Sequence, residues 1–441
     1  MRKTMRMTAA CLWAVSLTAG ETAWAQDGLA AAGATAISAA DTAWVLLSSA
    51  LVLAMIMPGL ALFYGGLVRS KNVLGTIMQS FAILCLVTVL WVLIGYSLAF
   101  GPDTWGLIGG LDWVALNGVG LAPNATYGPT VPHLAFMVFQ LMFAAITPAL
   151  ITGAFAERMK FSALMLFAAL WSLFVYAPIA HWLWGGGWLG KLGALDFAGG
   201  AVVHISSGVS ALVCALVLGA RHGYGTDYLA PHNLPMTLLG TGLLWFGWFG
   251  FNAGSALGAN QTAVTAFVAT HTAAAAGALA WVLIEWSHRG TPTVLGIASG
   301  AVAGLATITP GAGYVGVFSA LAIGLAAGAL SYLAIIWKGK FGYDDSLDVV
   351  GIHGVGGIFG ILATGLFASK TVNPGGADGL FFGNPGFFGV QAVAALTVAA
   401  FSCVGTFAIL KVVQRTVGLR VSPEEESIGL DISQHNERAY S

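Results

Sequence analysis

Residues 196–204 read DFAGGAVVH and residues 345–353 read DSLDVVGIH, so an aspartate precedes a histidine by eight positions in each half of the chain. Each stretch stands beside a long apolar segment. Ionisable residues within or beside such segments are costly in a bilayer and mark candidate functional sites. One histidine at the start of an apolar segment is more often a packing residue. A matched aspartate–histidine pair in both halves favours a site that the two halves build together.

The composition is that of a polytopic membrane protein. Of the 441 residues, 58% are hydrophobic and only 8% are charged, whereas soluble domains carry about 25% charged residues. The sixty glycines suit close helix packing in lipid. A net charge of −1 without a basic stripe gives no indication of nucleic-acid binding. The four scattered cysteines predict neither a disulfide framework nor a metal site, and no cofactor motif is present.

The N-terminus has the pattern of a signal peptide over residues 1–25. Three basic residues, Arg2, Lys3 and Arg6, precede an apolar segment, and residues 23–25 (AWA) resemble a cleavage site. An uncleaved first helix is the alternative.

Eleven apolar segments follow the leader, and each is long enough to predict a membrane-spanning helix. They cover roughly residues 41–68, 73–100, 133–156, 161–182, 197–219, 235–252, 262–286, 292–307, 313–337, 349–368 and 385–412. Basic residues concentrate in alternate loops and the C-terminal segment, whereas the intervening loops hold only Lys191 and Lys370. The positive-inside rule therefore predicts an N-terminus outside the cell and a C-terminus in the cytoplasm.

This topology gives the two aspartate–histidine stretches opposite directions. Asp196 stands at the outer start of span five, and Asp345 stands at the inner start of span ten. Eight helical residues rise about 12 Å, so two histidines approaching from opposite sides of a core about 30 Å thick come close near its middle. We therefore predict an all-α membrane protein in which spans one to five and six to ten form an inverted repeat. Span eleven is unpaired.

The predicted site is poor in metal ligands. Two imidazoles fall short of the three or four ligands usual for zinc, and each aspartate lies about 12 Å from its histidine along the helix. A facing histidine pair in an apolar lumen better suits the passage of a small neutral polar molecule or a proton, because imidazole can donate and accept a hydrogen bond.

Aromatic residues gather at the outer ends of spans four and six. Trp184 ends span four, and residues 248–255 (WFGFNAGS) end span six on the same face. Indole faces attract cations, and the hydroxyl of Ser255 can accept an N–H. An interfacial aromatic belt is the alternative, which we favour for Trp188.

These motifs resemble the Amt/Mep ammonium transporter family over nearly the whole mature chain. The resemblance rests on FYGGLVR at 63–69, FQ at 139–140, the stretches 196–204 and 248–255, residues 344–357, and the tail at 420–440. It implies a homotrimer in the bacterial inner membrane, with one apolar pore in each protomer.

The resemblance also assigns roles to individual residues. Ammonium would be recruited at an outer site formed by Trp184, Phe143 and Ser255, with Asp196 as a structural and electrostatic support. Phe143 and Phe251 would be stacked rings that close the pore beneath this site. His204 and His353 would line the lumen and share a proton, and Asp345 would support the inner mouth.

The implied activity is transport and not catalysis. Ammonium, or its analogue methylammonium, would lose a proton near the phenylalanine rings and cross as ammonia, and a separate proton route would make transport electrogenic. The implied domains are a signal peptide (1–25), an eleven-helix transport domain (26–414) and a cytoplasmic regulatory tail (415–441) that meets a PII-type signalling protein. An ammonium sensor on the same fold and, less favoured, a membrane metalloenzyme are the alternatives.

Two positions depart from the family pattern. Val350 replaces a common phenylalanine, which we expect to change only packing. Asn436 replaces a glycine in the tail. If that position is left-handed, asparagine is the next most tolerant residue, so we expect the tail to keep its shape.

Overall fold

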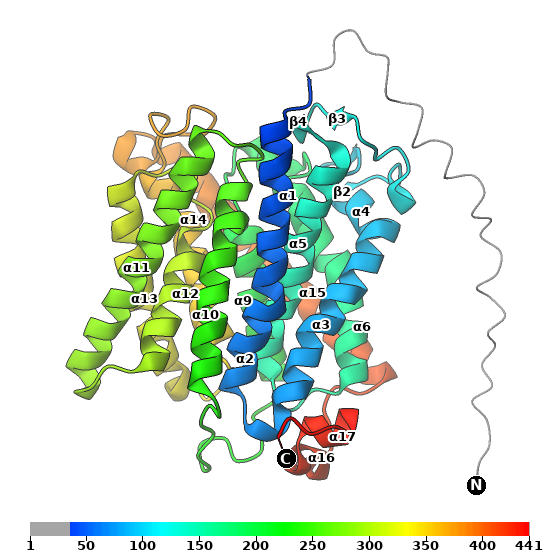
Figure 1. Ribbon diagram of the computed structural model, residues 1–441, viewed down its shortest axis with the longest axis vertical. Coiled ribbons are helices and arrows are strands. Elements are labelled where there is room, and N and C mark those ends of the chain that lie inside the picture. Colours follow the sequence, from blue (N-terminus) through cyan, green and yellow to red (C-terminus); the bar gives the residue numbers. More distant parts are fainter. Residues whose placement is uncertain (1–35, 441) are drawn as a thin grey trace, which may run out of the picture.

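Long apolar helices form most of residues 36–440, the part of the chain that the computed structural model describes (Figure 1). The predicted signal peptide, residues 1–25, lies outside the described residues. A helix satisfies its own backbone hydrogen bonds, which is why apolar segments in a bilayer fold this way.

The first half of the bundle contains five helical segments. Their elements are α1 (Ala39–Ala54), η1 (Met55–Leu60) and α2 (Ala61–Leu67); η2 (Ser70–Asn72), α3 (Val73–Leu90), η3 (Trp91–Gly95) and α4 (Tyr96–Phe100); α5 (His133–Ile151) and η5 (Thr152–Phe155); α6 (Phe161–Trp171), η6 (Ser172–Tyr176), α7 (Ala177–Leu183) and α8 (Trp188–Leu192); and η7 (Gly200–Ile205) with α9 (Ser206–Leu218).

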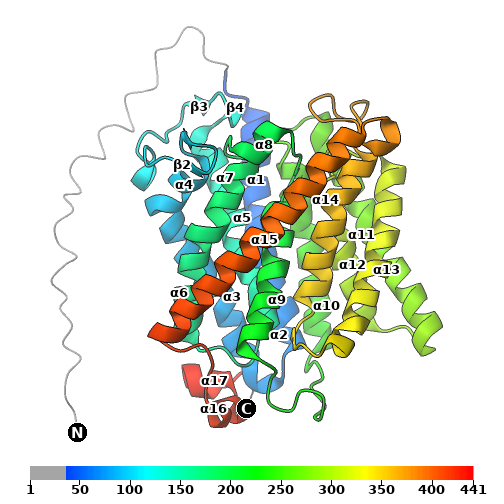
Figure 2. The same ribbon diagram turned by 180° about the vertical axis from the view of Figure 1, so that it is seen from behind.

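The second half contains five more segments and a long final helix. Their elements are α10 (Leu234–Trp248) and η8 (Phe249–Ala253); α11 (Gln261–Arg289); α12 (Val294–Ile308); α13 (Val317–Phe341); η9 (Val350–Gly354) and α14 (Val355–Phe367); and α15 (Pro385–Thr416). Short 3₁₀ turns are η4 (Val114–Leu116) and η10 (Leu380–Phe382). Figure 2 shows α15 slanting across the back of the bundle.

Ten of the described segments are long and apolar enough to cross a membrane. These ten match ten of the predicted spans. The remaining predicted span, 292–307, corresponds to α12, a shorter apolar helix of 15 residues. The chain is therefore a multi-pass membrane protein, and an eleventh crossing by α12 stays a prediction.

Two small hairpins occupy one end of the bundle, which we call the hairpin end (Figure 1). Strands β1 (Asp103–Thr104) and β2 (Ile108–Gly109) pair antiparallel, as do β3 (Pro123–Asn124) and β4 (Gly128–Pro132). The sequence analysis did not predict these strands. At the opposite end, the tail end, lie the C-terminal helices α16 (Pro423–Ile428) and α17 (Leu430–His435).

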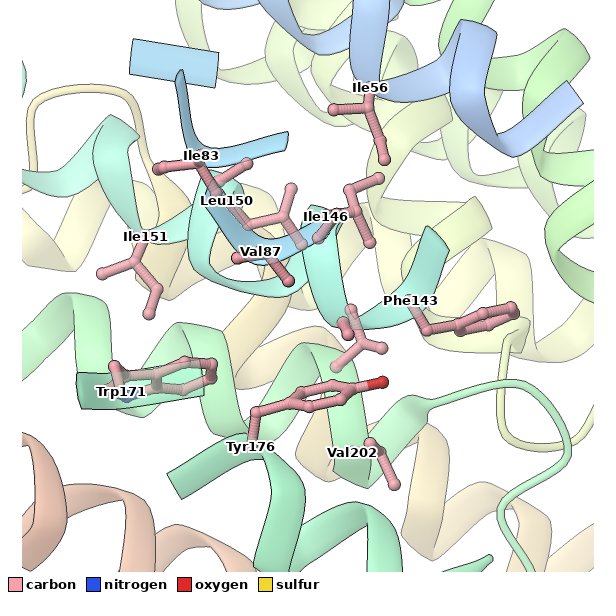
Figure 3. Close-up of a cluster of buried hydrophobic side chains, with 14 of the residues drawn as sticks. Ile56, Ile83, Val87, Phe143, Ile146, Leu150, Ile151, Trp171, Tyr176 and Val202 are labelled. Carbon is pink, nitrogen blue, oxygen red and sulfur yellow. The ribbon is translucent and has the colours of Figure 1, made fainter. Parts of the chain in front are cut away.

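The core centres on α5, which is the most buried of the membrane-spanning helices. Figure 3 shows side chains of α5, including Phe143 and Ile146, packed near Trp171, Tyr176 and Val202 from the neighbouring helices. All five side chains are buried. The core therefore lies where α5 meets the helices that surround it.

A close approach of two glycines joins the two halves. A Cβ atom on Gly208 of α9 would stand 2.1 Å from the backbone nitrogen of Gly354 in η9. Any side chain there would push the helices apart. This contact lies four residues after His204 and one residue after His353, so it places the two histidine-bearing helices against each other.

Candidate functional site

The two predicted histidines meet in the middle of the protein. The Nδ1 atoms of His204 and His353 are 3.1 Å apart, and the rings are stacked with centroids 5.1 Å apart. Both side chains are buried. A hydrogen bond between two Nδ1 atoms requires that one carries the proton and the other accepts it. Both rings are neutral when one proton lies in this contact and the accepting ring carries a second proton on its Nε2.

Both histidines lie in π-helical turns, as does Phe251. His204 belongs to η7, His353 to η9 and Phe251 to η8. A π-turn inserts one extra residue into a helix and is frequent at functional sites, because it re-aims side chains. The Nε2 atom of His204 has no hydrogen-bond partner among residues 36–440. This buried nitrogen is available to a small polar guest.

Three aromatic rings lead from the histidines toward the hairpin end. The rings of Phe143 and Phe251 are 4.3 Å apart and inclined by 31°. Trp184 meets Phe143 edge-on at 5.7 Å, and Phe251 lies 6.1 Å from the His204 ring. Phe143 and Phe251 are buried, while Trp184 is partly exposed. The order is thus an exposed indole, a closed pair of phenylalanines, and then the histidine pair.

Ser255 stands one turn beyond Phe251. Its hydroxyl donates to the backbone oxygen of Phe251 at 2.9 Å, which holds the side chain on this helix end. The oxygen keeps its lone pairs for an approaching N–H. Ser255 is partly exposed.

Asp196 caps the helix that carries His204. Its two carboxylate oxygens accept four backbone N–H groups, from residues 199–202, at 2.6–3.0 Å. Gly199 has φ = +111°, which favours glycine because it has no Cβ. The backbone oxygen of Asp196 accepts the indole N–H of Trp184 at 2.8 Å. With its carboxylate fully used, Asp196 fits a supporting role and not that of a direct ligand.

Asp345 caps the helix that carries His353, from the tail end. Its Oδ2 accepts the backbone N–H of Val350 at 2.7 Å, and its backbone oxygen accepts from Lys338 at 2.8 Å. Burial raises the pKa of Asp345 to about 6, although Lys338 opposes this shift. The two aspartates therefore do the same structural work from opposite ends of the bundle.

Trp248 was not assigned to the site by the sequence analysis, although it lies within the quoted stretch 248–255. Its ring stacks on His204 at 5.5 Å and 27°. The indole N–H donates to the hydroxyl of Thr309 at 3.0 Å. Nothing in the local sequence links these residues, because Thr309 follows α12, 61 positions away. The indole face forms one wall beside the histidines, and its only donor is already used.

A second group that was missed is a chain of buried charges at the tail end. Glu157 pairs with Arg69 at 2.6 Å and with Arg221 at 3.5 Å, and Arg221 pairs with Asp344 at 2.9 Å. Burial alone would raise the pKa of Glu157, but Arg221 and Arg69 outweigh it and hold the pKa below its ordinary value. The chain ties together four loops that are distant in sequence.

Arg158 anchors this region to the Asp345 loop. Its guanidinium is fully buried and donates to the backbone oxygen of Asp344 at 2.6 Å and to the hydroxyl of Ser346 at 2.6 Å. The loop that positions Asp345 is therefore fastened to the loop between α5 and α6. Residue spacing could not reveal this contact, because the partners are 186 and 188 positions apart.

The tail docks onto the same end. Glu426 accepts from Arg420 at 2.8 Å and from the backbone N–H of His222 at 2.7 Å. Asn436 has φ = +56° and ψ = +36° and ends α17, so the position is left-handed, the condition under which asparagine was expected to be tolerated. Ser422 forms a capping box with Glu425 at the start of α16. The tail is thus an ordered element fixed to the transmembrane helices.

Metal-ligating side chains do not cluster in the described part of the chain. Among residues 36–440, no three His, Cys, Asp or Glu side chains are grouped to hold a metal ion. The arrangement at the site is a stacked aromatic passage with one polar contact, between imidazoles. Such a lining suits a small neutral molecule that can exchange hydrogen bonds with imidazole.

Comparison with known proteins gives one consistent result. The model of the Ammonium Transporter Family matches residues 43–440. The "Ammonium transporter" of Bacillus subtilis is 54% identical over 401 residues, covering 91% of this chain and 98% of that protein. "Ammonium transporter Amt1" of Archaeoglobus fulgidus is 50% identical over 405 residues, covering 92% of this chain and 100% of that protein.

Solved structures agree. The crystal structure of Saccharomyces cerevisiae Mep2 superimposes with a TM-score of 0.83 and 38% identity, covering 88% of this chain and 89% of that one. A structure described as a "Sensor Amt Protein" superimposes with a TM-score of 0.82 and 30% identity, covering 90% of this chain and 98% of that one.

Proposed function

The chain belongs to the ammonium transporter family, and from this premise we propose that it recruits ammonium at its hairpin end and conducts ammonia past His204 and His353. Its relatives are named transporters and not enzymes. The single observation that carries the proposal is the stacked histidine pair, whose Nδ1 atoms are 3.1 Å apart, behind the closely spaced rings of Phe143 and Phe251.

Recruitment takes place at Trp184, Phe143 and Ser255. The indole face attracts a cation, and the Ser255 oxygen accepts one of its N–H groups. The Asp196 carboxylate contributes its negative field from behind, while its oxygens stay bonded to the helix start. A partly exposed site of this kind concentrates ammonium without binding it so tightly that it cannot leave.

Passage requires the loss of a proton. Phe143 and Phe251 leave no polar atom between their rings, so an ion entering there loses its hydration without compensation. Ammonium can avoid that penalty by giving up a proton and crossing as ammonia. Potassium cannot. The histidine pair then exchanges hydrogen bonds with the neutral molecule, and its shared proton supports a separate proton transfer that makes transport electrogenic.

The proposed topology is the one that the loop charges predict. The hairpin end faces outward and the tail end, with its basic loops and helices α16 and α17, faces the cytoplasm. In this arrangement α12 is the eighth of eleven crossings. Its 15 residues span about 22 Å, and its flanking turns complete the passage through a core about 30 Å thick.

An exposed histidine supports the proposed homotrimer. His271 lies exposed on α11, beside the rings of Trp245 and Phe249. An imidazole in mid-span is costly against lipid. Nearby, a groove of about 640 Å³ lies beside Trp44 and Phe267. A second copy of the chain covers both features, and native mass spectrometry in detergent should find three chains per particle.

The tail, residues 415–441, is the proposed contact for a PII-type signalling protein. Helices α16 and α17 lie at the tail end and are fixed to the loops that carry the buried charges. A partner that bound there would act on loops directly connected to Asp345.

The sensor alternative has one structural observation in its favour, the close superposition on a sensor protein of the same fold. In the described residues after α15, which ends at Thr416, the chain forms two short helices. A metalloenzyme is less favoured, since two imidazoles supply too few ligands.

Current measurement on purified protein separates these functions. The protein is reconstituted on a solid-supported membrane and exposed to pulses of ammonium, with potassium pulses as the control. A transporter gives a current with ammonium and none with potassium. A sensor binds ammonium without current. If neither current nor uptake of labelled methylammonium is found, the transport proposal is wrong.

A further inference from the structure

The β1–β2 hairpin displays an apolar surface that the transport site does not use. We define this surface, the hairpin patch, by Trp105, Leu107 and Leu111, which are 90%, 51% and 64% exposed. Between residues 101 and 132 the sequence contains no lysine or arginine. We propose that the hairpin patch inserts into the headgroup and upper acyl region of the adjacent membrane leaflet and anchors this end of the protein.

The backbone holds Trp105 outward in an unfavourable conformation. Its φ is +57°, a value that is a genuine outlier for a bulky residue. Two contacts fix the next residue, because Gly106 donates to Asp103 Oδ1 at 2.8 Å and accepts from the backbone N–H of Trp188 at 3.0 Å. These two hydrogen bonds fix the backbone of the turn that carries Trp105. Strain that the surroundings maintain points to a function for the side chain.

The hairpin is fastened to α7, and α7 packs against α15. The backbone oxygen of Leu107 accepts the indole N–H of Trp182 at 2.8 Å, and the Trp182 ring lies 4.6 Å from Phe401 of α15. Both ribbon views place this region at the lateral edge of the bundle (Figures 1 and 2). The hairpin patch therefore continues the apolar flank of the protein instead of facing the mouth at the centre.

Charge and residue type favour lipid over a protein partner. Asp103, the acid beneath the patch, is already paired with His181 and Lys191. Tryptophan is enriched at the membrane–water interface, where its ring is apolar and its N–H remains wet. The same hairpin backbone holds Trp182 and Trp188, which flank Trp184. Anchoring the patch thus fixes the depth of the mouth relative to the membrane surface.

Spin labelling tests the insertion directly. Single cysteines replace Trp105 or, as the matched control, Thr126, which is exposed in the same loop. The background carries alanine at Cys11, Cys85, Cys214 and Cys403. The full chain is reconstituted in vesicles of phosphatidylethanolamine and phosphatidylglycerol, and label collisions with oxygen and with a water-soluble nickel chelate are measured.

At position 105 we expect loss of collisions with the nickel chelate and a gain with oxygen, relative to position 126. Equal access of the nickel chelate to both positions overturns the proposal, and would leave a soluble protein partner as the occupant to seek. Leu111→Cys provides a second labelled position where the Trp105 variant fails to fold, with the same expected result. Because the vesicles contain only lipid and this chain, an inserted label cannot be attributed to another protein.

Discussion

A tail residue, Asp431, caps the N-terminus of a transmembrane helix, α3. Asp431→Ala should therefore destabilise both the docked tail and the first turn of α3. Helix α3 starts at Val73, and its third backbone N–H, that of Gly75, donates to Asp431 Oδ1 at 2.8 Å. The residue before the helix, Asn72, turns its own side chain to accept the backbone N–H of Leu430 at 2.8 Å. The tail and the start of α3 therefore hold each other.

The magnitude follows from the two parts of this interaction. Replacing a helix-capping side chain by alanine costs about 0.5–2 kcal/mol. A negative charge at a helix N-terminus contributes about 0.3–1 kcal/mol, rising to about 2 when partly buried, and Asp431 is 2% exposed. A loss of about 2 kcal/mol corresponds to about a 30-fold shift of the tail toward the undocked state.

Hydrogen exchange measures this shift in the full-length protein in detergent. We expect Asp431→Ala to accelerate exchange by about 30-fold in peptides covering 70–80 and 423–440, since local opening governs the rate. Asp431→Asn should show a smaller effect, because asparagine caps nearly as well but lacks the charge. Glu437→Gln, which changes an exposed acid of the same tail, should behave as wild type. Unchanged exchange in both peptides of Asp431→Ala would refute the reasoning.

Three further predictions concern the mouth, the loop acid and the buried arginine. Trp184→Leu should raise the half-saturating ammonium concentration by about 3–30-fold through loss of a cation–π contact, whereas Trp188→Leu should not; equal values for the two variants count against the recruitment site. Because burial raises the pKa of Asp345 to about 6, the folded state binds a proton that the unfolded chain has released, and stability falls as the pH rises from about 4 to 6. Asp345→Asn should lack this pH dependence, so its free energy of unfolding relative to wild type should rise by up to about 3 kcal/mol between pH 4 and 7. The same pH dependence of the free energy of unfolding in both proteins would contradict the assignment. Arg158→Met should lower the free energy of unfolding by about 3–5 kcal/mol by leaving buried partners unpaired; an unchanged melting temperature would show that these contacts are dispensable.

The sequence predicted those features whose signals are local or periodic. Apolar length identified the helices, and the repeated spacing of Asp196–His204 and Asp345–His353 indicated that the histidines meet. The tolerance of Asn436 for a left-handed conformation could also be anticipated, because it depends on one residue's backbone preference. Each of these expectations needed only the order, spacing and charge of residues along the sequence.

Other features could not be predicted because they depend on contacts between distant segments. The Trp248–Thr309 pair spans 61 positions and the Gly75–Asp431 cap spans 356. Their residue types carry no local pattern that distinguishes them from ordinary packing. The hairpins escaped prediction because strands of two to five residues are too short for an alternating pattern to be detected.

The central claim is that His204 and His353 line the conduction path, and the most direct test is the current of His204→Ala. The purified variant is compared with wild type and with His288→Ala, a histidine variant at the tail end of α11, on a solid-supported membrane with ammonium and potassium pulses. We predict that His204→Ala loses the ammonium current or admits potassium while the trimer still assembles, and that His288→Ala behaves as wild type. Wild-type ammonium current with full exclusion of potassium in His204→Ala would contradict the account.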